Sequence, residues 1–152
     1  MSPPADLMRI FVSSVALAVA AVAFAGPVPA MSGYKSSKRP LLVFAPDRAS
    51  PALAQQRRAV RSLQPAFQDR QVVVVYIVGD SVSAELGRAP RMTAEALRGR
   101  YGVGKDDFRA VLIGKDGGVK ISSSTPLAAT AIFDTIDAMP MRREEAKRPK
   151  SG

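Results

Sequence analysis

The sequence contains no cysteine, no histidine and no tryptophan among its 152 residues. Without cysteine there is no thiol nucleophile, no disulfide, no Cys-ligated zinc and no iron–sulfur cluster. Without histidine there is no imidazole base and no Ser-His-Asp triad. Thiol–disulfide oxidoreductase, peroxidase and histidine-dependent chemistry are therefore excluded. We expect neither a cofactor nor a metal, and the sequence favours a protein that is not an enzyme.

Acidic residues are few, with 13 Asp and Glu against 22 Lys and Arg, which gives a formal net charge of +9. Such an excess favours anionic partners, although it also serves solubility. The length predicts one domain, and the apolar fraction of 47% is typical of a globular protein. An anionic ligand or an acidic protein face is therefore the partner chemistry that we expect.

The first residues have the pattern of an export signal. An uncharged run covers residues 10–25 and ends in the A-x-A motif Ala23-Phe24-Ala25. This run is shorter than the ~20 residues that span a bilayer. We predict cleavage after Ala25, with cleavage after Ala30 or a retained anchor as alternatives, and a periplasmic or secreted protein. Export argues against a nucleic-acid partner, and we expect membrane contact only through an uncleaved N-terminus.

The chain divides into a signal peptide (1–25), a linker (26–38), a domain (39–141) and a charged, flexible tail (142–152). Continuous apolar runs at 41–45 and 72–78 predict strands covered on both faces. Ser50-Pro51 predicts a helix start between these strands, and Pro65 should end or kink that helix. The strand, helix and strand together form a βαβ unit.

The second half of the domain predicts one helix, a hairpin and a last helix. Residues 79–92 are polar and indicate a loop. Thr93 caps a helix that ends at Gly102. Strands at 108–113 and 119–122 flank an Asp-Gly turn, a strong hairpin signal. Thr125-Pro126 opens the last helix, and Pro140 ends it.

The predicted order β-α-β-α-β-β-α is that of a three-layer α/β sandwich with a four-stranded mixed sheet, and it resembles the thioredoxin fold. Two diagnostic parts of that fold are missing. The loop after the first strand reads Pro46-Asp47-Arg48-Ala49-Ser50-Pro51, without CxxC. No proline precedes the third strand, where the family usually has a cis-proline, and Asp107-Phe108 stands there instead. Because disulfide exchange needs a thiolate, this domain cannot perform it.

Three blocks, at 39–46, 112–120 and 136–145, together resemble one family. They read RPLLVFAP, LIGKDGGVK and IDAMPMRREE. This combination resembles the P-DUDES domain, a bacterial domain of unknown function that is shared with sushi-repeat extracellular proteins. The resemblance implies an exported, thioredoxin-like domain without redox cysteines. It brings no established activity.

One candidate site is the start of the first helix, where Asp47, Arg48 and Ser50 occupy the place of the thioredoxin thiols. A helix N-terminus offers free N–H groups and positive potential to an anionic ligand. The alternative is a polar turn in which Ser50 only caps the helix.

A second candidate is an interaction surface around the hairpin and the last block. Turn chemistry explains Asp116, Gly117 and Gly118 but leaves Lys115 and Lys120 unexplained. Two methionines followed by charged residues suggest an adaptable apolar contact with a charged rim. The alternative is that the methionines pack under the sheet while the arginines pair with Asp134, Asp137 or Glu145. The candidate surface comprises Lys115, Lys120, Asp137, Met139, Pro140, Met141, Arg142, Arg143 and Glu144.

These features lead to three functional hypotheses. The preferred one is a redox-inactive binding module for a protein or an anionic ligand of the cell envelope. The second is a thiol-independent enzyme with Asp47 as acid or base and Arg48 stabilising developing charge. The third is an envelope-surface protein that binds anionic lipid or glycan.

Overall fold

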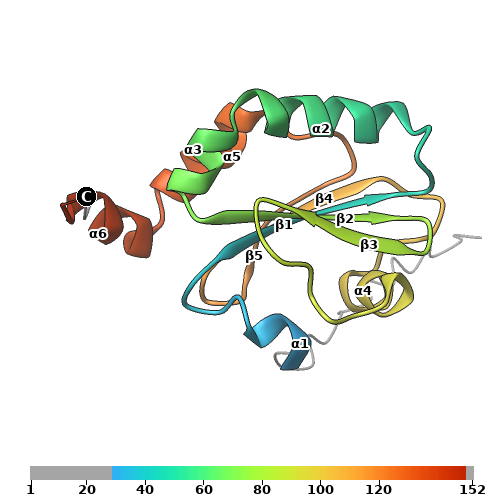
Figure 1. Cartoon of the computed structure of the whole chain (residues 1–152), viewed down its shortest axis with the longest axis horizontal. Helices are drawn as coiled ribbons and strands as arrows, with labels where there is room; N and C mark the ends of the chain where they lie inside the picture. Colours follow the sequence, from blue (N-terminus) through green and yellow to red (C-terminus); the bar gives the residue numbers. More distant parts are fainter. Residues whose placement is uncertain (1–28, 150–152) are drawn as a thin grey trace, which may run out of the picture.

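The computed structural model describes residues 29–149, which form an α/β sandwich around a five-stranded mixed sheet (Figure 1). The strand order is β3-β2-β1-β4-β5. The two central strands are parallel to each other, and every other pair of neighbours is antiparallel. The strands are β1 (Arg39–Ala45), β2 (Val72–Val78), β3 (Ser81–Glu85), β4 (Arg109–Ile113) and β5 (Val119–Ser123).

Helices cover both faces of this sheet. On one face lie α2 (Pro51–Ser62), α3 (Gln64–Asp69) and α5 (Ala129–Asp137), and on the other lie α1 (Pro29–Ser32) and α4 (Ala94–Tyr101) (Figure 1). A final helix, α6 (Pro140–Lys147), follows α5 at the end of the sandwich (Figure 1). The predicted three-layer fold class is therefore confirmed.

The central strands are buried along their whole length, as their continuous apolar runs predict. Alternate residues of a strand point to opposite faces of the sheet. Leu41 and Val43 accordingly join the core under α2 and α5, whereas Leu42 and Phe44 join the core under α4. Strand β1 thus contributes side chains to both hydrophobic cores.

The prediction of four strands was wrong, because residues 81–85 form the edge strand β3 rather than part of a loop. β3 pairs antiparallel with β2, and Val78 lies opposite Ser81 across the two-residue turn Gly79-Asp80. Gly79 has a φ of 56°, which suits a tight hairpin turn. The segment SVSAE alternates polar and apolar residues, as a half-exposed edge strand does.

Two helix boundaries also differ from the sequence prediction. The break predicted at Pro65 is present, but the chain resumes at once as α3, with this proline in its first turn. The helix that the sequence predicted as the last one, α5, begins at Ala129 rather than at Thr125-Pro126. Buried Gln56 holds the preceding loop, since its side chain accepts from the Leu127 N–H at 2.7 Å and donates to the Leu127 carbonyl at 3.0 Å.

The expected flexible tail is partly a helix. α5 ends at Asp137, before the predicted break at Pro140, and Pro140 instead occupies the first turn of α6, where a missing N–H costs nothing. Pairing of α6 residues with earlier parts of the chain, described below, explains why residues 142–147 are ordered.

The predicted signal peptide at 1–25, with its cleavage site after Ala25, lies outside the described residues. The described part of the predicted linker contains the short helix α1. Within residues 29–149, no helix is both long enough and apolar enough to cross a membrane.

The turn between β4 and β5 has the predicted Asp-Gly chemistry. The Gly114 N–H donates to the Gly118 carbonyl at 2.9 Å, and the Gly118 N–H donates to Asp116 Oδ1 at 2.9 Å. Gly117 has a φ of 83°, in the left-handed region that side chains rarely adopt. The turn therefore depends on glycine at this one position.

We predict that Gly117→Val destabilises the protein by about 1–3 kcal/mol, because a β-branched residue is strained at positive φ. A Cβ at this position meets no atom within 4 Å, so the loss would come from the backbone and not from a clash. Urea unfolding measures it. Gly117→Asn is the matched control, since asparagine tolerates this conformation and should cost much less. Equal stability of the valine variant and the wild type would contradict the turn assignment.

Candidate functional site

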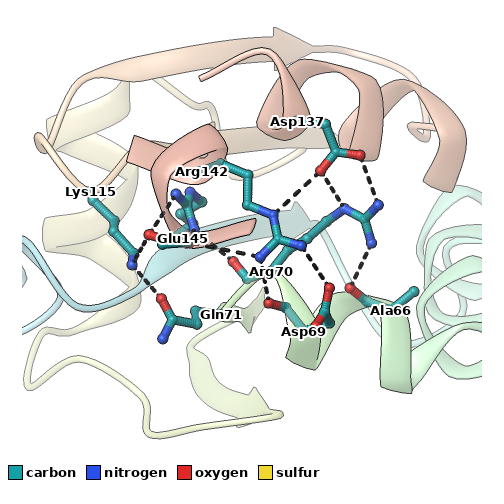
Figure 2. A network of polar contacts seen from close by, with 9 residues as sticks. Ala66, Asp69, Arg70, Gln71, Lys115, Asp137, Arg142 and Glu145 are labelled. Carbon is teal, nitrogen blue, oxygen red and sulfur yellow. Dashed lines mark hydrogen bonds and ion pairs between the residues drawn. The ribbon is translucent and has the colours of Figure 1, made fainter. Parts of the chain in front are cut away.

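A network of charged side chains gathers at one end of the sheet (Figure 2). It brings together residues from all three of the sequence blocks at 39–46, 112–120 and 136–145. Arg39 opens β1, Lys115 follows β4, and Glu145 belongs to α6. The antiparallel register, in which Leu41 lies opposite Leu112, places the start of β1 beside the end of β4. The pairing of β1 with β4 therefore places Arg39 beside Lys115, and α6 contributes the carboxylate of Glu145.

Glu145 is the centre of this network. Its two carboxylate oxygens accept from Arg39 Nη1 and Nη2, each at 3.2 Å, and Oε1 also accepts from Lys115 Nζ. Arg39 is fully buried and Lys115 is 7% exposed. Their remaining bonds go to neutral acceptors, namely the Arg70 carbonyl at 2.9 Å and the Gln71 side chain. Two buried cations thus share one carboxylate.

The carboxyl of Glu145 is ionised at neutral pH. Burial raises its pKa, but hydrogen bonds and charge interactions with Arg39 and Lys115 outweigh burial and hold the pKa below the usual 4.5. Glu145 is therefore a fixed anion and not a proton donor.

A second carboxylate, Asp137, joins the outer part of the network (Figure 2). Arg70 binds it with two bonds, from Nε at 3.0 Å and from Nη2 at 2.8 Å, and Arg142 Nε lies 3.5 Å away. The hydrogen bond from Arg70 lowers the pKa of Asp137 most, against a smaller effect of burial. Bidentate arginine–carboxylate pairs such as this one fix geometry as well as charge.

Arg142 ties α6 to the rest of the domain. Its Nη2 donates to Asp69 Oδ2 at 2.6 Å and its Nη1 donates to the Asp69 carbonyl at 2.9 Å. It also pairs with Asp137 and, at 3.8 Å, with Glu145. The alternative hypothesis, that the arginines of this block pair with acidic residues such as Asp137 and Glu145, is therefore correct for Arg142.

The rest of the last block divides between the core and the surface. Met139 packs against the core, whereas Met141 is 46% exposed, and Arg143 and Glu144 are exposed. Lys120 pairs with Asp116 at 2.7 Å on the hairpin. Of the nine residues expected to form an interaction surface, Lys115, Asp137 and Arg142 are bound within the protein, and Met141, Arg143 and Glu144 are open to solvent.

The candidate site after β1 lies elsewhere, at the opposite end of that strand, about 20 Å away at ~3.3 Å per residue. Ser50 caps α2, since its Oγ accepts from the Leu53 N–H at 3.3 Å. Asp47 Oδ1 accepts from the Ala49 N–H at 2.8 Å. Arg48 is exposed and lies beside Arg57, Arg58 and Arg61 of α2 along a shallow groove. Asp47 and Ser50 are thus engaged in the turn and the helix cap, whereas Arg48 extends into the groove.

A cavity of about 400 Å³ lies between the end of α1 with the segment that follows it, helix α4 and the β4–β5 turn. Its lining is mainly apolar, with two cations, Lys35 and Arg100, and one carboxylate, Asp116. The Tyr34 hydroxyl donates to the Arg88 carbonyl, and burial raises its pKa to about 12, so the phenol stays protonated. The apolar lining residues are Met31, Tyr34, Pro40, Tyr101, Ile113 and Val119.

Sequence reasoning missed this cavity because its residues come from four separate segments. It also missed Arg39 as a site residue, although an arginine directly before a wholly apolar strand is a usable signal. Within residues 29–149, no group of three Asp or Glu residues is placed to hold a metal ion.

We predict that Glu145→Gln lowers the unfolding free energy by about 2–4 kcal/mol at pH 7, because Arg39 and Lys115 lose their shared anion. The pKa of Glu145 is depressed in the folded state, so its contribution is complete above the ordinary value of 4.5 and declines below it. The gap between variant and wild type should therefore shrink as the pH falls below 4.5.

Denaturant unfolding at several pH values measures this gap. Glu144→Gln is the matched control, because Glu144 is exposed and, among residues 29–149, pairs with exposed Lys147. A pH-independent gap, or equal effects of the two substitutions, would contradict the role given to Glu145.

Comparison with known proteins agrees with the fold. The structure is similar to that of thioredoxin peroxidase I of Plasmodium yoelii, with a TM-score of 0.54, 15% sequence identity, and coverage of 80% of this chain and 83% of that chain. At this identity the similarity shows a thioredoxin-like fold and no more. Residues 30–145 match DUF4174, described as a domain of unknown function. The chain therefore belongs to the DUF4174 family.

Proposed function

We propose that the protein is a redox-inactive binding module whose ligand occupies the 400 Å³ cavity beside the β4–β5 turn. The observation that carries this proposal is the lining of the cavity, which combines apolar walls with two cations, Lys35 and Arg100, and one carboxylate, Asp116, that is already paired with Lys120. Ligand sites in proteins are typically concave and mostly apolar, with a few polar groups that orient the ligand. The matching ligand is a small molecule with an apolar ring or chain and one anionic group.

The walls of the cavity suit an aromatic or aliphatic body. Tyr34 and Tyr101 contribute rings, and the Tyr101 ring lies 6.2 Å from that of Phe44 in the core. Arg100 lies over the Tyr101 ring at 5.7 Å. Lys35 and Arg100 would meet the anionic group, in keeping with the net charge of +9.

The cavity is built on rigid elements, which favours binding without a large ordering cost. Pro40 belongs to the central strand β1 and Ile113 to β4. The Tyr34 hydroxyl is fixed by the Arg88 carbonyl, and the turn at 114–118 is closed by its own hydrogen bonds.

The enzyme hypothesis at Asp47 and Arg48 receives less support from the structure. Asp47 and Ser50 already accept backbone hydrogen bonds in the turn and the helix cap. Asp47 lines neither the 400 Å³ cavity nor the shallow groove beside Arg48. We also propose that the protein is related to the P-DUDES domains, that it is exported to the cell envelope and that its ligand or partner is found there.

We predict no disulfide reductase or peroxidase activity, because the chain has no cysteine to form the attacking thiolate. An insulin reduction assay and a peroxide consumption assay, both with dithiothreitol, measure these activities. Turnover by the purified protein above the dithiothreitol background would contradict the redox-inactive assignment.

The cavity is tested with 1-anilinonaphthalene-8-sulfonate, a fluorescent probe that has apolar rings and one anionic group. We expect saturable binding at one site of the folded protein. Val119→Trp should weaken binding at least about tenfold by filling the cavity, and Arg100→Met should weaken it about three- to tenfold by removing the charge partner.

Ser83→Trp is the matched control, because Ser83 is exposed on the edge strand β3 and does not line the cavity. It should bind the probe like the wild type. Equal binding by the wild type and both tryptophan variants would place the probe elsewhere and contradict the proposed site.

A further inference from the structure

The shallow groove along helix α2 concentrates positive charge on the surface of the protein. It is lined by Arg48, Leu53, Ala54, Arg57, Arg58 and Arg61. None of these residues is acidic, and residues 51–62, which form α2, contain no Asp or Glu. The groove is therefore a cationic strip flanked by apolar side chains, and the proposed binding of a small ligand does not use it.

Most of the charge in this groove is not balanced by the protein itself. Arg48 and Arg58 are exposed, and neither takes part in an ion pair within residues 29–149. Arg61 pairs with Glu85 at 3.2 Å, but its side chain is 62% exposed. Asp47 adjoins Arg48 in the chain, but its Oδ1 accepts from the Ala49 N–H and it does not line the groove. Cationic donors are thus presented to solvent.

Two of the arginines are held in place by neighbouring strands. The Arg57 guanidinium lies over the ring of Tyr76 in β2, 4.6 Å from its centroid. The Tyr76 hydroxyl donates to Glu85 Oε2 at 3.0 Å, and Arg61 Nε donates to Glu85 Oε1 at 3.2 Å. These contacts orient both arginines before a ligand binds, which lowers the ordering cost of binding.

The spacing of the arginines matches an extended peptide. Arg57 and Arg61 are one helical turn apart, about 6 Å along the axis at 1.5 Å per residue. In an extended chain, side chains two residues apart lie on the same side, about 6.6 Å from each other. Acidic side chains at alternate positions would therefore meet successive arginines, and a guanidinium can bind a carboxylate with two parallel hydrogen bonds.

We propose that this groove binds an extended, acidic peptide segment of a partner protein, whose carboxylates pair with Arg48, Arg58 and the neighbouring arginines of α2. This surface is separate from the 400 Å³ cavity, because α2 covers the face of the sheet opposite to α1 and α4 (Figure 1). The two sites can therefore be tested independently.

Other polyanions fit this surface less well. Helices that lie on membranes place large apolar side chains beside their cationic ones. The large apolar residues of α2, Leu53 and Val60, are buried in the core, and a single exposed leucine, Leu63, follows the helix. A glycan would offer hydroxyl donors, but arginine, leucine and alanine side chains have no hydrogen-bond acceptor for them.

Fluorescence polarisation of a labelled peptide tests the proposal. The probe alternates glutamate and alanine, has blocked ends and is titrated with the full chain at constant ionic strength. We expect saturable binding. The double substitution Arg48→Gln with Arg58→Gln should weaken it at least about tenfold, because two charge-assisted contacts are lost. Both side chains are exposed, so this variant should fold like the wild type, which denaturant unfolding checks.

Arg91→Gln with Arg148→Gln is the matched control, because both arginines are exposed, lie outside the groove and change the net charge equally. This variant should bind the peptide within about twofold of the wild type. Equal losses in the groove variant and the control would overturn the proposal, because binding would then depend on net charge alone. Absence of saturable binding to the wild type would overturn it as well.

Vesicles of phosphatidylglycerol and heparin serve as competing classes of polyanion, measured with the same two double variants. The peptide should be the probe with the largest difference between the groove variant and the control. A larger difference with vesicles or with heparin would overturn the assignment of an acidic peptide.

Discussion

The arrangement of this end of the molecule depends on the burial of Arg39 beside Glu145. A guanidinium with no solvent exposure needs a carboxylate within reach, because an unpaired buried charge is expensive. The chain supplies this carboxylate from Glu145, by folding residues 140–147 back toward the start of β1. Sheet register places Lys115 at the same point, so a hairpin, a central strand and the last helix become one unit.

The protein has a thioredoxin-like fold but no cysteine, so it keeps the backbone arrangement of that fold without the thiol chemistry. At the end of β1 where thioredoxins keep their thiols, Asp47 and Ser50 satisfy the backbone of a turn and a helix cap. The proposed ligand cavity and a smaller cavity of about 70 Å³ lie near the other end of β1, on either side of residues 114–118. Pro40 lines the larger cavity and Arg39 the smaller one, because adjacent residues of a strand face opposite sides of the sheet.

Sequence patterns predicted the elements whose signals are local. The apolar runs of β1 and β2, the Ser50 cap, the break at Pro65 and the turn at Gly117 are each set by neighbouring residues. Strand β3 was missed because only alternate residues of a half-exposed edge strand are apolar, whereas a central strand is apolar along its whole length. Helix α6 was missed because its charged residues are typical of a flexible tail until their partners are known.

The sequence alone therefore determined the absence of thiol chemistry, the α/β fold class and the two central strands, since composition and periodicity act without long-range contacts. Tertiary structure decided which charges are paired. Arg39 and Glu145 are 106 positions apart, and no local pattern links them. It also decided where the cavities lie, because a cavity is the space left between segments that only the packed sheet and helices bring together.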